Sequence, residues 1–397
     1  MSVTRTRPRF IAALALLLVM AVLWSSCGDD DSLNATSTPR AGASSVASTT
    51  AERAAFKVGI VQSLTGAGAV YGKTVIEGMK LAIDEVNASS DLDVDLVPIV
   101  IDDKSTPAGA ADAVKQLVSD QAGAILGPTL SGAAPDAHKL AQDASIPVLA
   151  STTTGPGITD VGDYIFRIAL AEAVVVPSVI EHVSKDTQLK QAVLIIDSTD
   201  AFSKLSAAAM RTGMANVNGK VSVEIDLAQT DLATALAGLK GQSVDAFLIT
   251  PLVEKSGPAA AAVRAAGFTQ PIIGGNSFNT LDVARLAGPA AIEGAYVGAA
   301  WNPGVDSKAS QAFVAAYTKK YGRAPDLFAA QGYATIEVLA DGLRRAKSTD
   351  HAKLRTALAA TANLETPLGK LSISKTREAV HPSVLQRYKG SQLTVVK

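Results

Sequence analysis

Hydrophobic and polar positions alternate between two kinds of pattern along most of the chain. Short apolar runs such as FKVGIV, which starts at Phe56, are rich in β-branched residues and typical of strands. Between these runs lie segments such as Tyr71 to Asn87, in which apolar residues recur at helical spacing. A regular order of strand, helix and strand predicts a parallel sheet with helices on both of its faces.

Two such series follow one another along the chain. The first has predicted strands at 56–61, 94–101, 123–126 and 146–150, with helices at 71–87, 110–119 and after Ser131. The second begins near Glu172 with a helix to residue 180, has strands at 192–196, 220–225, 246–249 and 271–275, and has helices around Met210, Leu236 and Val263. Long helices are predicted at 307–321 and 327–346. One open sheet with so many strands would be unusual, so we predict an α/β fold of two lobes, each with a doubly wound parallel sheet.

The N-terminus has the pattern of an export signal. Residues 1–26 place three arginines before an apolar run, Phe10 to Trp24, which is too short to span a bilayer comfortably. The only cysteine, Cys27, follows in LWSSC, which resembles a bacterial lipobox with Trp24 where leucine is usual. The resemblance implies lipidation of Cys27, and secretory cleavage without a lipid is the alternative. Residues 27–55 are poor in apolar side chains, so we predict a lipidated cysteine followed by a flexible tether.

Composition argues against a nucleic-acid partner. The chain of 397 residues has 36 basic and 37 acidic side chains, for a formal net charge of -1. Removing the three N-terminal arginines leaves 33 basic against 37 acidic side chains, a net charge of -4. No basic surplus is left to offset phosphates. The export signal also argues against a DNA-binding regulator with this lobe architecture.

The sequence lacks the motifs of the common catalytic and cofactor sites. No histidine stands at metal-ligand spacing from another histidine or from the cysteine, so no metal is expected; the histidines are His138, His182, His351 and His381. The phosphate-loop, dinucleotide and nucleophile-elbow patterns are also missing, so we expect no cofactor and no enzymatic activity. The acid pair Asp102 and Asp103 is expected to be a strand end that meets water.

Two loops that follow neighbouring strands suggest a binding site. The loop in ILGPTLSGAAPD, residues 125–136, leaves a strand and opens a helix, and Ser131 is expected to cap that helix near Gly132. Free amides at a helix N-terminus favour a carboxylate or another anion. The next strand ends in STTTGPG, which is again small and hydroxylated. Since ligands of open parallel sheets lie at the carboxyl ends of strands, we expect one shared polar site.

Several stretches of the chain, taken in order, resemble a known protein family. The strings KVGIVQSLTGAGAVYGKTVIEGMKLAIDEVNA, GPTLSGAA and IPVLASTTT, in this order, resemble the type I periplasmic binding proteins for leucine, isoleucine and valine, which serve ABC transporters. The resemblance implies two lobes joined by a three-strand hinge that close on a ligand like a Venus flytrap. Lobe 1 would comprise 56–172 plus 300–375, and lobe 2 would comprise 173–299 plus 376–397.

The resemblance also implies which residues contact the ligand. Those expected are Tyr71, Ser131, Gly132, Thr152, Thr153, Thr154, Phe202, Leu252, Asn276 and Trp301. Ser131 and the threonine loop would bind a carboxylate, and Tyr71 would close over it. Leu252 stands where amino-acid binders of this family have a tyrosine, and Asn276 where they have an acid that grips the ammonium. Because asparagine is neutral, a ligand without the amino group becomes an option. Glu172, at the first crossing, is expected to be a solvated hinge residue.

We therefore expect an exported solute-binding protein, anchored by lipid to the outer face of a bacterial membrane. It would be a monomer that captures a small carboxylate-bearing or amino-acid-like molecule and presents it to ABC permease and ATPase subunits on separate chains. A ligand-sensing receptor subunit and a secreted α/β enzyme remain the alternatives. The sequence leaves the ligand open among amino acids, other carboxylates, amides and ureas, and it also leaves open which membrane carries the anchor.

Overall fold

The computed structural model describes residues 53–89 and 91–396. The expected signal peptide, Cys27 and most of the tether lie outside the described residues. Among the residues described, no helix has both the length and the apolar character needed to cross a bilayer. The predicted tether extends too far: Ala54 already begins strand β1 (Ala54–Gln62), and Arg53 pairs with Asp95 and donates to the carbonyl of Ser89. Pairing with β2, rather than local composition, decides where the folded part begins.

The first sheet has five parallel strands in the order β2-β1-β3-β4-β5. The strands are β1, β2 (Val94–Asp102), β3 (Ala124–Leu126), β4 (Val148–Ala150) and β5 (Ile165–Arg167). The helices α1 (Ala69–Ala88), α2 (Pro107–Ser119) and α3 (Ala134–Asp143) connect them, with short 3-10 turns at Ser131–Ala133 and Thr159–Val161. Side chains of β1 alternate between its faces: Val58 and Ile60 join the core under α1, whereas Val61 packs with α2 and α3. Both faces are therefore covered, as a parallel sheet requires.

The second sheet has seven strands in the order β15-β14-β10-β9-β8-β6-β7. The parallel strands are β6 (Gln191–Ile196), β7 (Lys220–Asp226), β8 (Ala246–Ile249), β9 (Ile272–Gly274) and β10 (Tyr296–Ala299), followed by antiparallel β14 (Val384–Lys389) and β15 (Gln392–Val395). Helices α4 (Glu172–Asp186), α5 (Ala201–Asn216), α6 (Leu232–Gly238), α7 (Val253–Ala265), α8 (Asp282–Ala287) and α9 (Pro289–Ile292) surround it, with a 3-10 turn at Asn276–Phe278.

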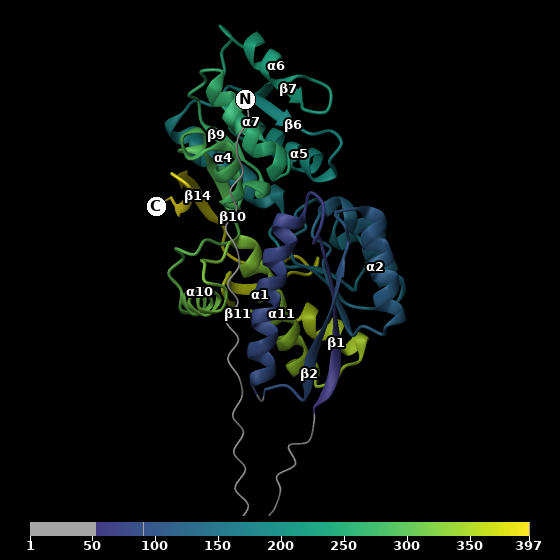
Figure 1. Cartoon of the computed structure of the whole chain (residues 1–397). Helices are drawn as coiled ribbons and strands as arrows, with labels where there is room; N and C mark the ends of the chain where they lie inside the picture. Colours follow the sequence, from purple (N-terminus) through teal and green to yellow (C-terminus); the bar gives the residue numbers. More distant parts are fainter. Residues whose placement is uncertain (1–52, 90, 397) are drawn as a thin grey trace, which may run out of the picture. The chain divides into compact units, whose positions relative to one another are not determined.

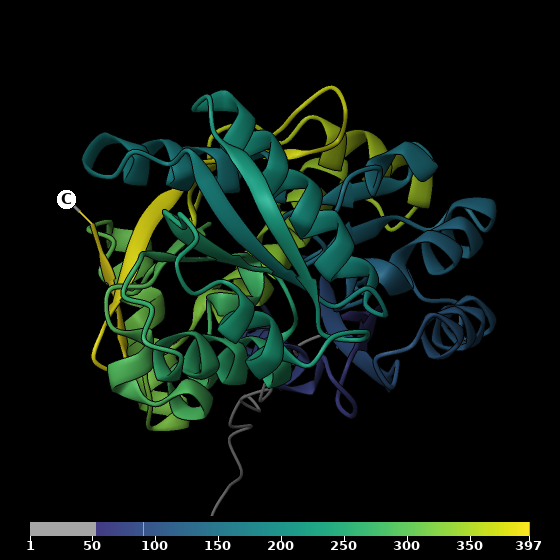
Figure 2. The ribbon, with the colours of Figure 1, turned by 90° about the horizontal axis from the view of Figure 1, so that it is seen from above.

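The burial of β6 shows how helices cover both faces of this sheet. Val193 and Ile195 belong to the core that includes α7, whereas Leu194 and Ile196 pack with α4 and α5. Figure 2 shows helices on either side of these strands. Strands buried on both faces consist of continuous apolar residues, as AVLII does. The sequence prediction of two α/β lobes with doubly wound parallel sheets is confirmed.

The chain passes between the two sheets after β5, after β10 and after β13 (Ala379–Val380). Helices α10 (Lys308–Tyr321), α11 (Leu327–Ala346) and α12 (His351–Ala359) follow the second passage and pack beside the first sheet, where Tyr317 of α10 bonds to Glu77 of α1. They lead into a small antiparallel sheet of β11 (Leu364–Thr366), β12 (Gly369–Ile373) and β13. Because β13 pairs with β12 and Glu378 bridges to Arg167 of β5, the chain stays with the first lobe beyond residue 376, where the second lobe was expected to resume.

Several short elements have no counterpart in the sequence prediction, namely β5, β10, β11 to β13, α8, α9 and α12. Strands of two to five residues contain too few positions to establish an alternating pattern. Their pairing partners, such as β4 for β5 in the register Leu149 to Phe166, come from the tertiary fold.

Helices α1 and α11 lie side by side in the first lobe, and two glycines allow their close approach (Figure 1). A Cβ on Gly332 of α11 would stand 2.2 Å from the carbonyl oxygen of Val75 in α1. A Cβ on Gly78 of α1 would stand 2.0 Å from the carbonyl oxygen of Ala329 in α11. Each helix therefore presses its backbone against the other, which fixes Tyr71 on α1 and Phe328 on α11 relative to one another.

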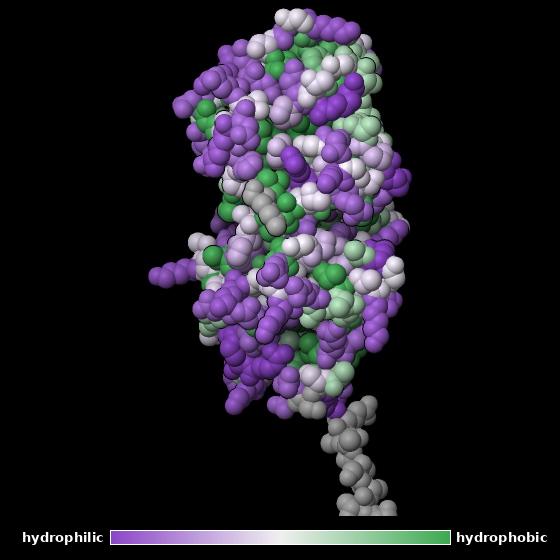
Figure 3. Space-filling model, turned by 90° about the vertical axis from the view of Figure 1, so that its left-hand side faces the viewer, coloured by the Kyte–Doolittle hydropathy of each residue, from purple (hydrophilic) through white to green (hydrophobic). Residues whose placement is uncertain are grey.

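The face of the molecule in Figure 3 is mainly hydrophilic, with apolar side chains in small, separate groups. The large apolar side chains exposed among the described residues are Val97, Val174, Leu281 and Val380. They come from different elements, and scattered apolar side chains of this kind are normal on a soluble protein.

Candidate functional site

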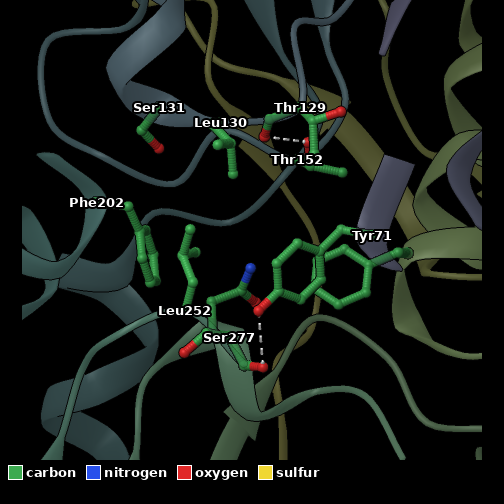
Figure 4. A pocket seen from close by; sticks show the side chains of 10 residues that line it. Tyr71, Thr129, Leu130, Ser131, Thr152, Phe202, Leu252 and Ser277 are labelled. Carbon is green, nitrogen blue, oxygen red and sulfur yellow. Dashed lines mark hydrogen bonds between the residues drawn. The ribbon is translucent and has the colours of Figure 1, made fainter. Parts of the chain in front are cut away.

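Loops at the carboxyl ends of strands from both sheets meet around one small cavity, shown in Figure 4. Its volume is about 20 Å³, far below that of a typical ligand cleft, so the two sets of loops are in contact. The lining residues are Tyr71, Thr129, Leu130, Ser131, Thr152, Phe202, Leu252, Asn276, Ser277 and Phe328. Six of the ten predicted contact residues thus line one cavity: Tyr71, Ser131, Thr152, Phe202, Leu252 and Asn276.

Ser131 does not cap a helix as predicted but bonds to the neighbouring loop. It is the first residue of the 3-10 turn, and helix α3 begins only at Ala134 without a side-chain cap. The Ser131 hydroxyl oxygen instead accepts hydrogen bonds from the backbone N–H groups of Thr154 and Gly155, at 3.1 and 3.2 Å. The cap prediction is wrong because this turn brings the hydroxyl to the adjacent loop rather than to its own helix. Ser131 therefore ties the two predicted binding loops together.

The threonine loop after β4 is buried and partly unpaired. The Thr152 hydroxyl donates to the carbonyl of Thr129 at 2.7 Å, which joins the loops a second time. The hydroxyls of Thr153 and Thr154 are buried without a hydrogen-bond partner. Neither lines the main cavity, but Thr154 lines a neighbouring cavity of about 10 Å³ together with Glu172, Asn276 and Gln331. A buried hydroxyl without a partner is energetically unfavourable. The Thr154 hydroxyl is therefore free to form a hydrogen bond with another molecule beside the site.

Tyr71 joins the two lobes. Its hydroxyl accepts from the backbone N–H of Val253 at 2.9 Å and lies 3.4 Å from the carbonyl oxygen of Ser277, to which it donates. Val253 is the first residue of α7 and Ser277 lies in the 3-10 turn after β9, both beside the second sheet, whereas Tyr71 lies in the first turn of α1. Its ring packs on Phe328 with centroids 4.8 Å apart. Burial raises the pKa of the Tyr71 phenol, so it remains a neutral donor.

Glycines let the loops of the two sheets approach closely. A Cβ on Gly132 would stand 2.8 Å from the Cβ of Ala201, at the start of α5. A Cβ on Gly155 would stand 2.6 Å from a methyl of Leu205 in the same helix. Gly132 does not line the cavity, and its place at this contact indicates a role in closure rather than in touching a ligand.

The acid pair at the end of β2 does not simply meet water as expected. Asp103 is buried and accepts hydrogen bonds from the Ser63 hydroxyl and from the backbone N–H of Ser105, at 2.7 and 2.8 Å. Asp102 accepts from the backbone N–H of Leu64 at 2.9 Å. The two carboxylates thus fix the loop between β1 and α1, which carries Tyr71. The sequence shows the strand end, but only the fold brings these donors to it.

Glu172 is not the solvated hinge residue that the sequence suggested. Its side chain is only 4% exposed and accepts from the backbone N–H of Asn276 at 2.7 Å and from the Ser206 hydroxyl at 3.2 Å. Its own backbone N–H donates to the carbonyl of Thr154 at 3.0 Å. Glu172 therefore connects the threonine loop to the loop that carries Asn276. Burial raises the pKa of its carboxyl to about 7, against the opposing hydrogen bonds from Asn276 and Ser206.

Replacing Glu172 tests this burial through the pH dependence of stability. Because its pKa is 4.5 in the ordinary state and about 7 when folded, wild-type stability should fall as pH rises through this window and level off above it. The glutamine in Glu172→Gln cannot ionise, so the variant does not lose stability in this way as the pH rises. The unfolding free energy of the variant minus that of wild type should increase by about 2–3 kcal/mol from pH 5 to pH 8. Denaturant unfolding of the ligand-free protein at both pH values measures it, and an unchanged difference would contradict the buried carboxyl.

Trp301 lies apart from the other predicted contacts. Its indole N–H donates to the Ser310 hydroxyl at 2.9 Å and its ring packs on Phe313, with centroids 5.6 Å apart. It borders a larger side cavity of about 470 Å³, which Asn279, Asn302 and Gln386 also line. The structure therefore places Trp301 in the core behind this side cavity and not with Ser131 and Thr152.

Four residues of the main cavity were not predicted: Thr129, Leu130, Ser277 and Phe328. The first three adjoin predicted residues, so extending each loop by one or two positions would have found them. Phe328 is the second residue of α11, far from the binding loops in sequence, and only the packing of α11 on α1 brings it to the site. No pattern in the sequence marks it.

A family model described as periplasmic binding protein matches residues 55–392. The chain is similar to the Leu/Ile/Val-binding protein homolog 3 of Brucella melitensis, with 24% identity over 347 residues, 86% of this chain and 93% of that protein. It is also similar to the leucine-specific-binding protein of Salmonella typhimurium, with 25% identity over 59% of this chain and 65% of that protein.

Solved structures share the fold over the same part of the chain. The branched-chain amino acid transporter substrate binding protein of Streptococcus pneumoniae, solved in complex with isoleucine, has 26% identity and a TM-score of 0.80, over 86% of this chain and 99% of that one. A solute binding protein of R. palustris, solved in complex with benzoate, has 24% identity and a TM-score of 0.77, over 86% of this chain and 95% of that one.

Proposed function

Starting from the fact that this chain belongs to the periplasmic binding protein family, we propose that it captures a small carboxylate-bearing or amino-acid-like molecule between its lobes for an ABC importer. One observation carries the proposal. Segments that follow six strands, three in each sheet, converge on a single cavity that Tyr71 bridges with two interlobe hydrogen bonds. Ligands of open parallel sheets bind at such strand ends.

The first lobe supplies the carboxylate-binding groups in this proposal. The Ser131 oxygen already accepts two backbone hydrogen bonds, so its own hydrogen is the group left to donate to a ligand. On the adjoining loop the Thr154 hydroxyl is unpaired, whereas the Thr152 hydroxyl already donates to the carbonyl of Thr129. Closure of the second lobe then adds Phe202, Leu252 and Asn276 and excludes water, which strengthens each hydrogen bond. The differential affinity for the closed form drives the movement.

In this proposal the protein has two lobes, a lipid anchor and separate partner subunits. The first lobe comprises residues 56–172 and 300–375 with the β13 strand, and the second comprises 173–299 with β14 and β15. The protein acts outside the cytoplasm as a monomer, and a lipid on Cys27 holds it at the membrane. Permease and ATPase subunits are separate chains that recognise the closed form. The protein carries no enzymatic activity of its own, in keeping with its solute-binding relatives.

A ligand screen by thermal shift tests the proposal. The panel contains branched-chain, acidic and aromatic amino acids, aliphatic and aromatic carboxylates, amides and ureas, each added to the whole protein. A ligand at 100 times its dissociation constant adds about 2.7 kcal/mol to the unfolding free energy and so raises the melting temperature. At least one carboxylate-bearing compound should do so in a saturable manner. If amides or ureas bind and carboxylates do not, the proposed ligand class is wrong.

Substituting Ser131 tests the carboxylate site itself. Ser131→Ala should weaken the carboxylate identified in the screen by about 1–3 kcal/mol, because the ligand loses a donor and two backbone N–H groups lose their acceptor. Isothermal titration calorimetry measures the change. Thr65→Ala serves as a control, since Thr65 is exposed and its hydroxyl bonds to Asp102 outside the cavity. Equal affinities of wild type and Ser131→Ala would show that Ser131 only ties the loops together.

A further inference from the structure

We propose that Asn276 offers the bound molecule a hydrogen-bond donor, because a chain of buried side-chain amides holds its oxygen away from the ligand. The inference rests on the proposed function and names the chemistry that the site selects. The chain runs from Asn302 through Gln386 and Asn279 to Asn276, and so reaches from the side cavity to the main cavity. The first three side chains are buried, with exposures of 3%, 1% and 1%.

Each amide in the chain donates to the next. The Asn302 Nδ2 donates to the Gln386 Oε1, and the Gln386 Nε2 donates to the Asn279 Oδ1. The Asn279 Nδ2 then donates to the Asn276 Oδ1 at 3.1 Å. Within an amide the oxygen only accepts and the nitrogen only donates, so the direction of one amide fixes that of its neighbours.

Backbone groups at Asn302 and at Asn279 fix the direction of the chain. The backbone N–H of Gly304 can only donate, and it lies 2.8 Å from the Asn302 side-chain oxygen. The carbonyl oxygens of Gly298 and Asn276 can only accept, and they lie 3.0 and 3.1 Å from the Asn279 Nδ2. Turning over Asn302, Gln386 or Asn279 would set donor against donor or acceptor against acceptor at a buried site, which is unfavourable. The backbone thus orients Asn302 and Asn279 independently, and the two orientations agree.

The orientation of Asn276 follows. Its Oδ1 is engaged by Asn279, so its Nδ2, for which the described residues provide no acceptor, is the group left for the cavity. The nearby Glu172 carboxyl does not accept a hydrogen bond from this nitrogen, because the carboxyl accepts from the backbone N–H of Asn276 and from the Ser206 hydroxyl. A donor at this place favours a keto, hydroxyl or carboxylate oxygen of the ligand and repels an ammonium. The bound molecule is therefore a carboxylate with a second acceptor, and not an α-amino acid with its ammonium at Asn276.

Matched pairs of probes test the inference on the full-length protein. L-leucine, L-phenylalanine and L-glutamate are each compared with the corresponding 2-oxo acid, which replaces the ammonium by a keto oxygen. Calorimetry should give at least about tenfold tighter binding of the 2-oxo member in the pair that fits the cavity best. Tighter binding of the amino member would overturn the inference and leave the proposed function intact. Absence of binding by every pair and by every carboxylate of the first screen would overturn both.

Two variants test the orientation of the Asn276 side chain: one removes the partner of its oxygen, and the other replaces its nitrogen. Asn279→Asp removes the donor that engages the Asn276 oxygen, so Asn276 is free to turn and the preference for the 2-oxo acid should fall about tenfold. Asn276→Asp keeps the bond from Asn279 and should fold normally, but it places a negative oxygen in the cavity and should weaken the 2-oxo acid at least about tenfold. Asn218→Asp, exposed in the same lobe, controls for the charge and should leave both affinities unchanged. An unaltered preference in Asn279→Asp and Asn276→Asp would overturn the inference.

Discussion

Gly332→Ala is expected to lower the unfolding free energy of the ligand-free protein by about 3 kcal/mol, near the upper end of ordinary overpacking effects. The added Cβ would stand 2.2 Å from the carbonyl oxygen of Val75, closer than any real contact of this kind. That oxygen belongs to the backbone of α1, so no side-chain rotation relieves the clash and the two helices must separate. The measurement is guanidinium unfolding of purified protein without added ligand.

Gly238→Ala is the matched control for this prediction. It makes the same change within helix α6, where an added Cβ meets nothing within 4 Å. Because alanine restricts the unfolded chain more than glycine does, this variant should be stabilised by about 0.4–1 kcal/mol. If both variants changed stability in the same direction and by the same amount, the close contact between α1 and α11 would not be limiting.

Gly132→Val is expected to weaken ligand binding about 100-fold while leaving the stability of the ligand-free protein within about 1 kcal/mol of wild type. The valine Cβ would stand 2.8 Å from the Cβ of Ala201, which has no rotatable side chain to move away. Since the two residues belong to different lobes, the clash disfavours the closed form and is relieved when the lobes separate. A ligand that requires closure must then work against this clash.

The closure mechanism requires that Gly132→Val lowers the ligand affinity without lowering the stability of the ligand-free protein. Calorimetry with the ligand from the screen gives the affinity, and denaturant unfolding without ligand gives the stability. Gly238→Val carries the same substitution in α6 away from the lobe contact and should leave the affinity unchanged. Wild-type affinity in Gly132→Val would show that binding does not need Gly132 and Ala201 to approach as they do here. A parallel loss of stability would show instead that Gly132 matters for folding.

The amide chain and the interlobe contacts act on different aspects of binding. Tyr71 and Gly132 bring the lobes together, whereas the chain that ends at Asn276 sets what the second lobe presents to the ligand. The pairs of amino and 2-oxo acids compare ligands of similar size, so a clash at Gly132 should weaken both members alike. A change at Asn279 should alter their ratio. The two kinds of variant therefore distinguish closure from selectivity.

Much of the fold could be predicted from the sequence because it depends on local periodicity. Runs such as AVLII at β6 are apolar without interruption, as strands covered on both faces must be, and α11 shows helical spacing over its whole length. The loops after β3 and β4 that line the main cavity could be predicted as well, since they follow predictable strands and contain small hydroxyl residues. Ser131 and Thr152 meet because parallel strands end at the same edge of a sheet.

The sequence by itself thus determined the two α/β lobes, the family and the position of the loops that line the main cavity. Only the tertiary structure decided what individual polar groups do. Ser131 holds the neighbouring loop instead of a helix end, Glu172 is buried against Asn276, and Phe328 reaches the cavity through helix packing. The donor and acceptor pattern around a side chain is set by residues distant in sequence, as Asn302 and Gln386 are from Asn276, and no local pattern records such partners.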